Sequence, residues 1–556
     1  MPVSANSPYS RPIAKVLGAR GSYSMLLLAL AFALLVSSVY WEHVLEDAMI
    51  SFRYALRLAE HYPLGFWNRE GPAVEGCTST LWVVLLSFAG PNVSHIIVLS
   101  KACGLACYFA IPATLLWLST IEVDPKEMDP AKFQEACWFA ALGALVYIPL
   151  AWYATTGMET ALFTLLVTLL VFVPLRTSSV ALITVLNILL ITTRPDGVLF
   201  AAGSATYFCI FDVINRRRRA TILGLCLAAF AAVVAARYAY FGELMPNTYY
   251  AKAGGSGLSH VGYGLRYVGT WAASHWFLLI PMALLSVELA RGRQHARFPT
   301  ALGLALLGYC AIIIKVGGDN PTAFPLWRHA VQVMPLIFFL TFYALSTLRT
   351  GVPVKVLMVL LIAGLPTFAL FPPWQSEVLL RQAAIGIRRP TFFANQPFNP
   401  FFLWLKSISG EHTLIATGLA GELPLVVDSP SIDVLGLNDA YIAHHGTFDP
   451  KGPVDSKSDM NYVISRRPDI IEGKIPASLI IEGHDYSDLI ANRTQMVQAM
   501  LSNQYFKDNY LFVTDAPYQY FDRAIFIHKD FYERALQSGI PLKAVPVTLA
   551  IKYASS

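Results

Sequence analysis

The sequence has little charge for its length. Lys, Arg, Asp and Glu make up 14% of its 556 residues, whereas 55% of the residues are hydrophobic and the mean hydropathy is +0.51. Soluble domains are about 25% charged, so this composition excludes an ordinary soluble enzyme and indicates a polytopic membrane protein. The formal net charge is only +5, and the basic residues are scattered or follow apolar runs, which is typical of topology signals. We therefore expect no nucleic-acid partner.

Cysteine and repeats are also scarce. Six of the seven cysteines lie in or beside apolar runs, and none has a histidine spaced for a zinc site. Cys77 is the exception, in a polar loop, and the last third of the chain has no cysteine, which excludes a disulfide framework there. The absence of a fixed-period repeat or low-complexity tract excludes a solenoid.

Long apolar runs dominate residues 24–370. A membrane span needs about 20 mainly apolar residues, and about eleven runs approach this length. They are residues 24–41, 96–118, 136–150, 161–175, 180–191, 197–211, 220–236, 276–289, 299–314, 330–345 and 354–370. The basic N-terminus precedes the first run, which has no small-residue cleavage site and is predicted to be an uncleaved helix.

The basic residues set the orientation. Arg216 to Arg219, the arginines at 291, 293 and 297, and the basic N-terminus all fall on the cytoplasmic side only if residues 78–89 do not cross. We therefore expect 78–89 to form a surface or re-entrant helix in an external loop, residues 42–95. An odd number of spans then leaves the C-terminus on the periplasmic side of an inner (plasma) membrane, and the N-terminus in the cytoplasm.

The chain divides at Phe371, where the apolar runs end. Residues 1–371 form the predicted transmembrane domain, and residues 372–556 form a soluble mixed α/β periplasmic domain. Short β-rich runs separated by turn residues indicate the second domain. They are residues 413–417, 425–427, 479–481, 511–513 and 524–527.

Two acids directly follow the first span. Glu46 and Asp47 begin an amphipathic segment at the membrane surface, where an ionised group is costly unless it faces a cavity, a cation or a substrate. Asp47 is the first candidate for a catalytic base or nucleophile, and Glu46 is the second. The alternative is a helix N-terminal charge, with Glu46 paired to Arg53.

Cations are predicted at the same membrane face. Arginine binds phosphate through planar, bidentate donors, so these side chains suit an anionic lipid head group whose phosphate departs. The candidate phosphate ligands are Arg194, Lys252, Arg328, His329 and Arg53. Alternatively, Arg194 pairs with Asp196 in a Pro-Gly turn, and Lys252 and Arg328 reach lipid head groups.

Further polar residues on this face are candidates for substrate contact or for supporting the reacting acids. They are Glu75, Glu159, Asp196, Asn247, Tyr249 and Asp319. Asp319 is equally explained by a pair with Arg328, and Tyr249 by the interfacial aromatic belt. Asp47, Glu46 and Asp319 could hold a divalent cation, although no ligand spacing requires one, and no other cofactor is predicted.

Several motifs together resemble the membrane-embedded C-type glycosyltransferases. They are Glu46-Asp47-Ala48 with Ile50 to Ala55, Glu75-Gly76-Cys77-Thr78-Ser79, Gly157-Met158-Glu159-Thr160, Thr193 to Gly197, Pro246-Asn247-Thr248, Gly317-Gly318-Asp319 with Arg328, and Val434 to Asp439. Within that fold (GT-C), the resemblance is strongest to the mycobacterial terminal arabinofuranosyltransferase B group. Glu46 stands where these proteins often have a second aspartate, so it is open which acid reacts.

The resemblance implies sugar transfer from a polyprenyl-phosphate donor. Decaprenyl-phosphoryl arabinofuranose is the implied donor, and a cell-envelope glycan or glycoprotein is the implied acceptor, bound with help from the C-terminal domain. A mannosyl or other pentosyl transferase is the alternative within this class. A transporter of lipid-linked sugar and a non-catalytic envelope scaffold are the alternatives outside it. Retention or inversion stays open, because base and nucleophile roles fit the same acid.

Overall fold

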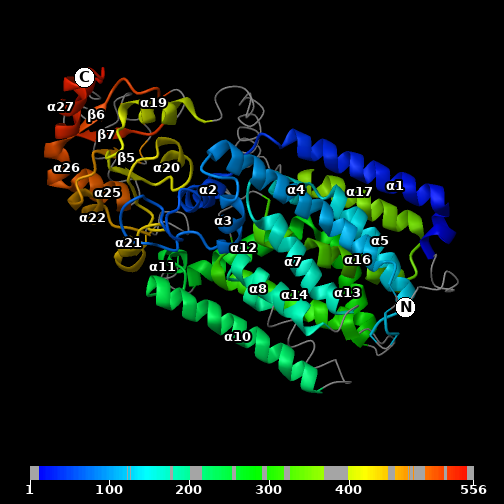
Figure 1. The fold of residues 1–556 in the computed structure, drawn as a ribbon. Helices are drawn as coiled ribbons and strands as arrows, with labels where there is room; N and C mark the ends of the chain where they lie inside the picture. Colours follow the sequence, from blue (N-terminus) through cyan, green and yellow to red (C-terminus); the bar gives the residue numbers. More distant parts are fainter. Residues whose placement is uncertain are drawn as a thin grey trace.

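A computed structural model gives the fold of the chain (Figure 1). The structure describes residues 12–121, 123–125, 127–175, 179–200, 216–252, 258–290, 297–318, 326–368, 398–448, 457–473, 475, 477, 480, 495–518 and 522–547. A helical domain is followed by a smaller domain built on a mixed sheet, as the sequence predicts. The predicted boundary at residues 371 and 372 lies outside the described residues.

The helical domain contains long apolar helices and short helices between them. Its first half comprises α1 (Pro12–Val39), α2 (Glu46–Ala59), α3 (Thr80–Ser87), α4 (Val93–Leu118), α5 (Pro130–Val146), α6 (Ile148–Thr155), α7 (Thr160–Phe172), η1 (Val173–Leu175) and α8 (Val180–Thr193). Its second half comprises α10 (Arg216–Phe241), α11 (Asn247–Lys252), α12 (Leu258–Ser274), α13 (Trp276–Ala290), α14 (Arg297–Val316), α15 (Arg328–Val331), α16 (Met334–Thr347) and α17 (Val352–Phe368).

Four described helices are long and apolar enough to cross a membrane, or up to six if each bent pair forms one span. The four are Gly21–Val39, Val93–Leu118, Ala220–Phe241 and Arg297–Val316. Large apolar side chains on these helices are exposed, such as Leu28 at 71% and Leu227 at 59%, as expected for a surface that faces lipid. Shorter apolar helices cover Thr160–Leu175, Val180–Thr193, Met334–Thr347 and Val352–Gly364.

Two predicted runs are broken by proline. The run at 136–150 is divided at Tyr147 between α5 and α6, which meet at 57°, because Pro149 has no N–H to donate back to the preceding turn and its ring clashes with that turn. The run at 330–345 is divided between α15 and α16 just before Pro335. Most of the predicted span 197–211 lies outside the described residues. The segment 78–89 contains only the eight-residue α3, which is too short to span.

The second domain has a six-stranded sheet in the order β2-β1-β5-β7-β6-β8, and a separate pair, β3 and β4. Strands β2, β1 and β5 are parallel to one another, and β7, β6 and β8 each pair antiparallel with the strand before them in this order. The strands are β1 (Ile415–Thr417), β2 (Ser431–Asp433), β3 (Thr447–Phe448), β4 (Lys457–Ser458), β5 (Ile470–Glu472), β6 (Tyr510–Val513), β7 (Ile525–His528) and β8 (Ala544–Pro546).

Both faces of this sheet are covered. Along β6, Leu511 and Val513 belong to one hydrophobic cluster, and Tyr510 and Phe512 belong to the other, as the alternation of a strand requires. The helices are α19 (Pro400–Ile408), α20 (Glu422–Val427), α21 (Ala440–His445), α22 (Met460–Ser465), α25 (Gln495–Ser502), α26 (Gln504–Asn509) and α27 (Lys529–Gln537). The predicted strand at 425–427 is therefore wrong: these residues are the end of α20. The predicted run at 479–481 lies mostly outside the described residues.

Figure 1 shows how the two domains meet. The second domain lies against α2 and α11, at one end of the helical domain, and α10 runs from the opposite end towards it. Contacts of α2 with α20, and of α11 with α21, form this junction.

Candidate active site at the junction of the two domains

The acid pair lies in the first turn of α2, beneath the second domain. Glu46 and Asp47 are half-buried, and the rest of the helix from Ala48 to Arg57 is buried. Negative charge in a first turn is stabilised by the positive end of the helix dipole. α2 therefore places two acids where the helical domain, the external loop and the second domain meet.

The turn after α6 contacts the start of α2. The amide of Leu45 donates to Thr156 O at 3.1 Å, and Trp82 Nε1 donates to Gly157 O at 3.0 Å. Gly157 has a φ of +89°, and a Cβ atom there would lie 2.6 Å from Phe52 Cζ. Only glycine therefore fits this turn and lets α2 pack on it.

The second domain contacts Glu46 through Gly421. The amide of Gly421 donates to Glu46 Oε1 at 2.6 Å, and a Cβ atom at residue 421 would lie only 2.0 Å from Glu46 O. Burial, and then the negative charge of Asp47, raise the pKa of Glu46, with smaller contributions from Asp433 and Glu422. The hydrogen bond from Gly421 favours the carboxylate, but burial and Asp47 outweigh it, so the protonated form of Glu46 is favoured.

A second polar cluster follows α8. Arg194 donates to Glu159 Oε1 at 2.8 Å and to both carboxylate oxygens of Asp196 at 2.9 and 3.3 Å. His329 Nδ1 lies 3.9 Å from Asp196 Oδ2. Burial alone would raise the pKa of Asp196, but the charges of Arg194 and His329 outweigh burial and lower it. The structure thus brings together four predicted residues from three loops, and the predicted pairing of Arg194 with Asp196 is found.

The remaining predicted cations lie on short helices. Arg328 and His329 open α15, where Arg328 is 8% exposed, and Lys252 ends α11. Asp319 lies outside the described residues. Among the described residues, no group of three or more His, Cys, Asp and Glu side chains is arranged to hold a metal ion, so a cation shared with Asp319 stays a prediction.

Arg53 serves the domain junction. Its Nε donates to Trp67 O at 2.7 Å, and its terminal nitrogens donate to Asn68 Oδ1 and Ser429 O, both at 3.0 Å, and to Pro424 O. With these acceptors, the side chain joins α2 to the external loop and to the second domain. It is not among the residues that gather near Arg194, and Glu46 bonds to Gly421 in place of the expected pair with Arg53.

The other predicted residues tie the external loop to the second domain. Asn247 Nδ2 donates to Gly436 O and Leu437 O, both at 2.8 Å, and its amide donates to Glu75 O at 3.2 Å. The carboxylate of Glu75 accepts from Arg237 at 2.5 and 3.1 Å. Tyr249 is 52% exposed, with its ring 5.6 Å from that of Tyr250.

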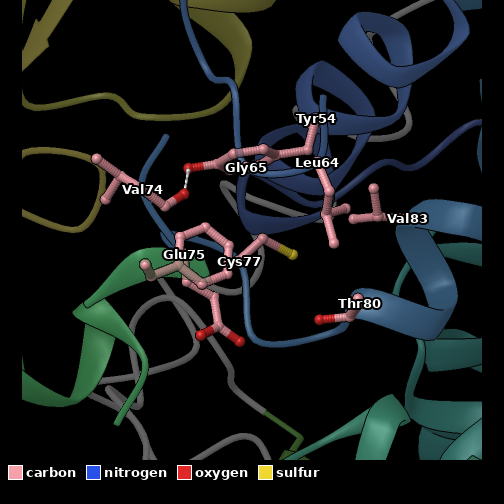
Figure 2. Close-up of a pocket in the computed structure, with 9 residues that line it drawn as sticks. Tyr54, Leu64, Gly65, Val74, Glu75, Cys77, Thr80 and Val83 are labelled. Carbon is pink, nitrogen blue, oxygen red and sulfur yellow. Dashed lines mark hydrogen bonds between the residues drawn. The ribbon is translucent and has the colours of Figure 1, made fainter. Parts of the chain in front are cut away.

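A small pocket lies beside Glu75, about two helical turns along α2 from the acid pair (Figure 2). Its lining is mostly apolar and comprises Tyr54, Leu64, Gly65, Val74, Glu75, Cys77, Thr80, Val83 and Phe241. The Tyr54 hydroxyl lies 2.9 Å from Val74 O, drawn in Figure 2, and 2.8 Å from Asn438 Oδ1. The pocket is therefore walled by α2, α3, the external loop and the end of α10.

Sequence reasoning missed three residues of this region. Gly421 gave no signal, because a close backbone approach between domains leaves no pattern in the sequence. Arg237 directly follows the apolar run at 220–236, where a basic residue is typical of the end of a membrane span. Lys101 stands alone in the apolar run at 96–118, and an ionisable residue at membrane depth is by itself a signal of function.

Comparisons with known proteins found solved structures of similar fold. No protein-family model matches the chain, and no curated protein matches it. The fold is similar to the crystal structure of ArnT from Cupriavidus metallidurans in the apo state, with a TM-score of 0.49 and 12% sequence identity. The alignment covers 91% of this chain and 98% of that chain.

Proposed function

We propose that this protein transfers a sugar from a polyprenyl-phosphate donor to a cell-envelope glycan or glycoprotein at the periplasmic face of the inner membrane. D-arabinofuranose, carried as decaprenyl-phosphoryl arabinofuranose, is the proposed sugar. The N-terminus is then cytoplasmic, and the second domain is periplasmic and contacts the acceptor.

One observation carries this proposal. Segments that are far apart in the sequence, and that make up the resemblance to GT-C transferases, converge at one end of the helical domain. The start of α2 contacts the turn at Thr156 and Gly157, and that turn leads to Glu159 and its ion pair with Arg194. Glu75, Asn247 and the 436–438 segment meet on the other side of α2.

Asp47 is the proposed reacting acid. A general base must be ionised, and burial beside Asp47 favours the protonated form of Glu46, so Glu46 is the second candidate. The amide of Gly421 holds the Glu46 carboxyl group in place. Asp47 would accept the proton of the acceptor hydroxyl as that oxygen attacks the anomeric carbon, or would itself attack that carbon.

The departing phosphate needs positive charge. Arg194 already bonds to two carboxylates, so we propose that it orients Asp196 and thereby His329. His329, Arg328 and Lys252 are the proposed phosphate contacts, because cations placed where charge develops stabilise a leaving group.

A purified-protein assay tests this proposal. The protein, in detergent or nanodiscs, is given decaprenyl-phosphoryl arabinofuranose and an arabinan oligosaccharide, and the product is followed by mass increase. We expect one pentose to be added per transfer. A parallel assay with polyprenyl-phosphoryl mannose tests the alternative donor, and movement of donor across a vesicle membrane without any product would instead support a transporter.

A further inference from the structure

A lysine is buried inside membrane helix α4. Lys101 is 1% exposed within Val93–Leu118, one of the four described helices able to span a membrane. A charged amine at this depth is costly unless its donors are satisfied, so its partners indicate what it does.

Three carbonyl groups from two segments accept the Lys101 amine. Nζ donates to Trp41 O at 2.5 Å, to His43 O at 2.7 Å and to Thr155 O at 2.7 Å. Trp41 and His43 belong to the connection between α1 and α2, and Thr155 is the last residue of α6. One ammonium group therefore joins the segment that ends at Glu46 to the segment that ends at Glu159.

The surroundings of Lys101 are built for this contact. Gly104 lies one turn further along α4, and a Cβ atom there would lie 2.1 Å from Ala154 O, so glycine is what lets α6 approach α4 closely. On the far side of the same junction, the amide of Leu45 bonds to Thr156 O. The connection from α1 and the turn after α6 are thus fixed to each other at two points.

We propose that Lys101 is a positioning residue for the reacting acid: it fixes the connection between α1 and α2, and so the place of Asp47 relative to Glu159. This inference rests on the proposed transfer reaction. A reacting group displaced by about 1 Å can lose about 100-fold in rate while the substrate still binds. The loss of Lys101 should therefore lower kcat and leave the KM for the donor nearly unchanged.

Three variants test this role. Lys101→Met removes the donors and keeps the length of the side chain. Lys101→Arg keeps the charge and N–H donors, although a planar guanidinium cannot aim three donors from one atom. The matched control is Lys355→Met, because Lys355 is also buried in an apolar helix, α17, at 3% exposure, but pairs with Glu135 at 2.7 Å instead of with these carbonyls.

We expect kcat to fall about 10- to 100-fold in Lys101→Met, with donor KM within about twofold of wild type, partial recovery of kcat in Lys101→Arg, and wild-type kcat in Lys355→Met. If Lys101→Met is not monodisperse, Lys101→Gln takes its place. We then expect kcat to be highest in wild type, lower in Lys101→Arg and lowest in Lys101→Gln. A folded Lys101→Met or Lys101→Gln variant that keeps wild-type kcat overturns the inference. A variant whose activity falls only through a higher donor KM also overturns it. The inference is also overturned if Lys101→Met and Lys101→Gln both misfold while Lys355→Met folds, because Lys101 is then needed for folding. Wild-type protein without transfer activity overturns the proposed function itself, which is a separate outcome.

Discussion

Glu46 and Asp47 are neighbours in the sequence but have different surroundings. Burial and the negative charge of Asp47 raise the pKa of Glu46, and they outweigh the hydrogen bond from the amide of Gly421, which favours the carboxylate. A carboxyl group that keeps its proton can take a different role in a reaction from an ionised carboxylate beside it. The sequence alone does not reveal the contact with Gly421, because it depends on how the second domain packs on α2.

The first prediction concerns the pH dependence of stability in Glu46→Gln. A carboxyl group whose pKa is raised by folding holds its proton more tightly in the native state, so native stability falls as pH rises through the interval between the unfolded and folded values. Glutamine resembles the protonated acid and does not titrate. The Tm of the variant should therefore rise relative to wild type between about pH 4.5 and pH 8. A difference in Tm that is constant with pH, or that falls, contradicts the raised pKa.

Residue type alone predicted some positions and misplaced others. Glu159, Arg194, Asp196 and His329 are predicted to lie on one membrane face, and the structure brings their side chains together. Arg53 has the same chemistry as Arg194, yet its donors hold backbone carbonyls of the second domain. The acceptors come from residues about 370 positions away in the sequence, which no local pattern reveals.

At the scale of elements, hydrophobic periodicity located helices well and their breaks poorly. The long runs correspond to α1, α4, α10 and α14 because one apolar run makes one membrane helix. The breaks lie just before Pro149 and Pro335, and hydrophobic periodicity takes no account of proline. Residues 425–427 form a helix despite their β-rich composition, since packing decides the state of such short segments.

The second prediction concerns the loop before α20. Gly421→Ala places a Cβ atom 2.0 Å from Glu46 O, so α20 must move away from α2. Overpacking of this kind costs about 1–3 kcal/mol, and we expect lower Tm together with lower transfer activity. Gly410→Ala is the control in the same domain, because its Cβ atom would meet nothing closer than Thr413 Oγ1 at 3.7 Å. Equal behaviour of the two variants contradicts the close approach.

Across the whole molecule, a network of side-chain ion pairs joins the two domains. Arg57 on α2 is 1% exposed and pairs with Glu60 at 2.7 Å and with Asp428 of the second domain. Arg69 of the external loop also pairs with Asp428, at 2.7 Å. The sequence predicted two domains, but not this contact, because ion pairs across a domain junction depend on the folded arrangement.

The third prediction tests this junction. Asp428→Ala leaves the buried Arg57 without its partner in the second domain, which we expect to cost about 2–4 kcal/mol. The loss should appear as faster proteolysis between the domains and a lower Tm. Arg534→Ala, at a pair with Asp469 in which the arginine side chain is 61% exposed, should cost less than about 1 kcal/mol. An equally small effect at Asp428 is incompatible with an ionic contribution to docking.

The most direct measurement of the central claim is the rate of transfer from decaprenyl-phosphoryl arabinofuranose by purified wild type and Asp47→Asn, with Asp129→Asn as an exposed control at the start of α5. Asparagine keeps the shape of the side chain and removes its charge. We expect the Asp47 variant to fold, with a Tm close to that of wild type, and to lose at least about 100-fold in rate, and the Asp129 variant to keep its rate. Full turnover by a folded Asp47→Asn protein would contradict the assignment of Asp47 as the reacting acid.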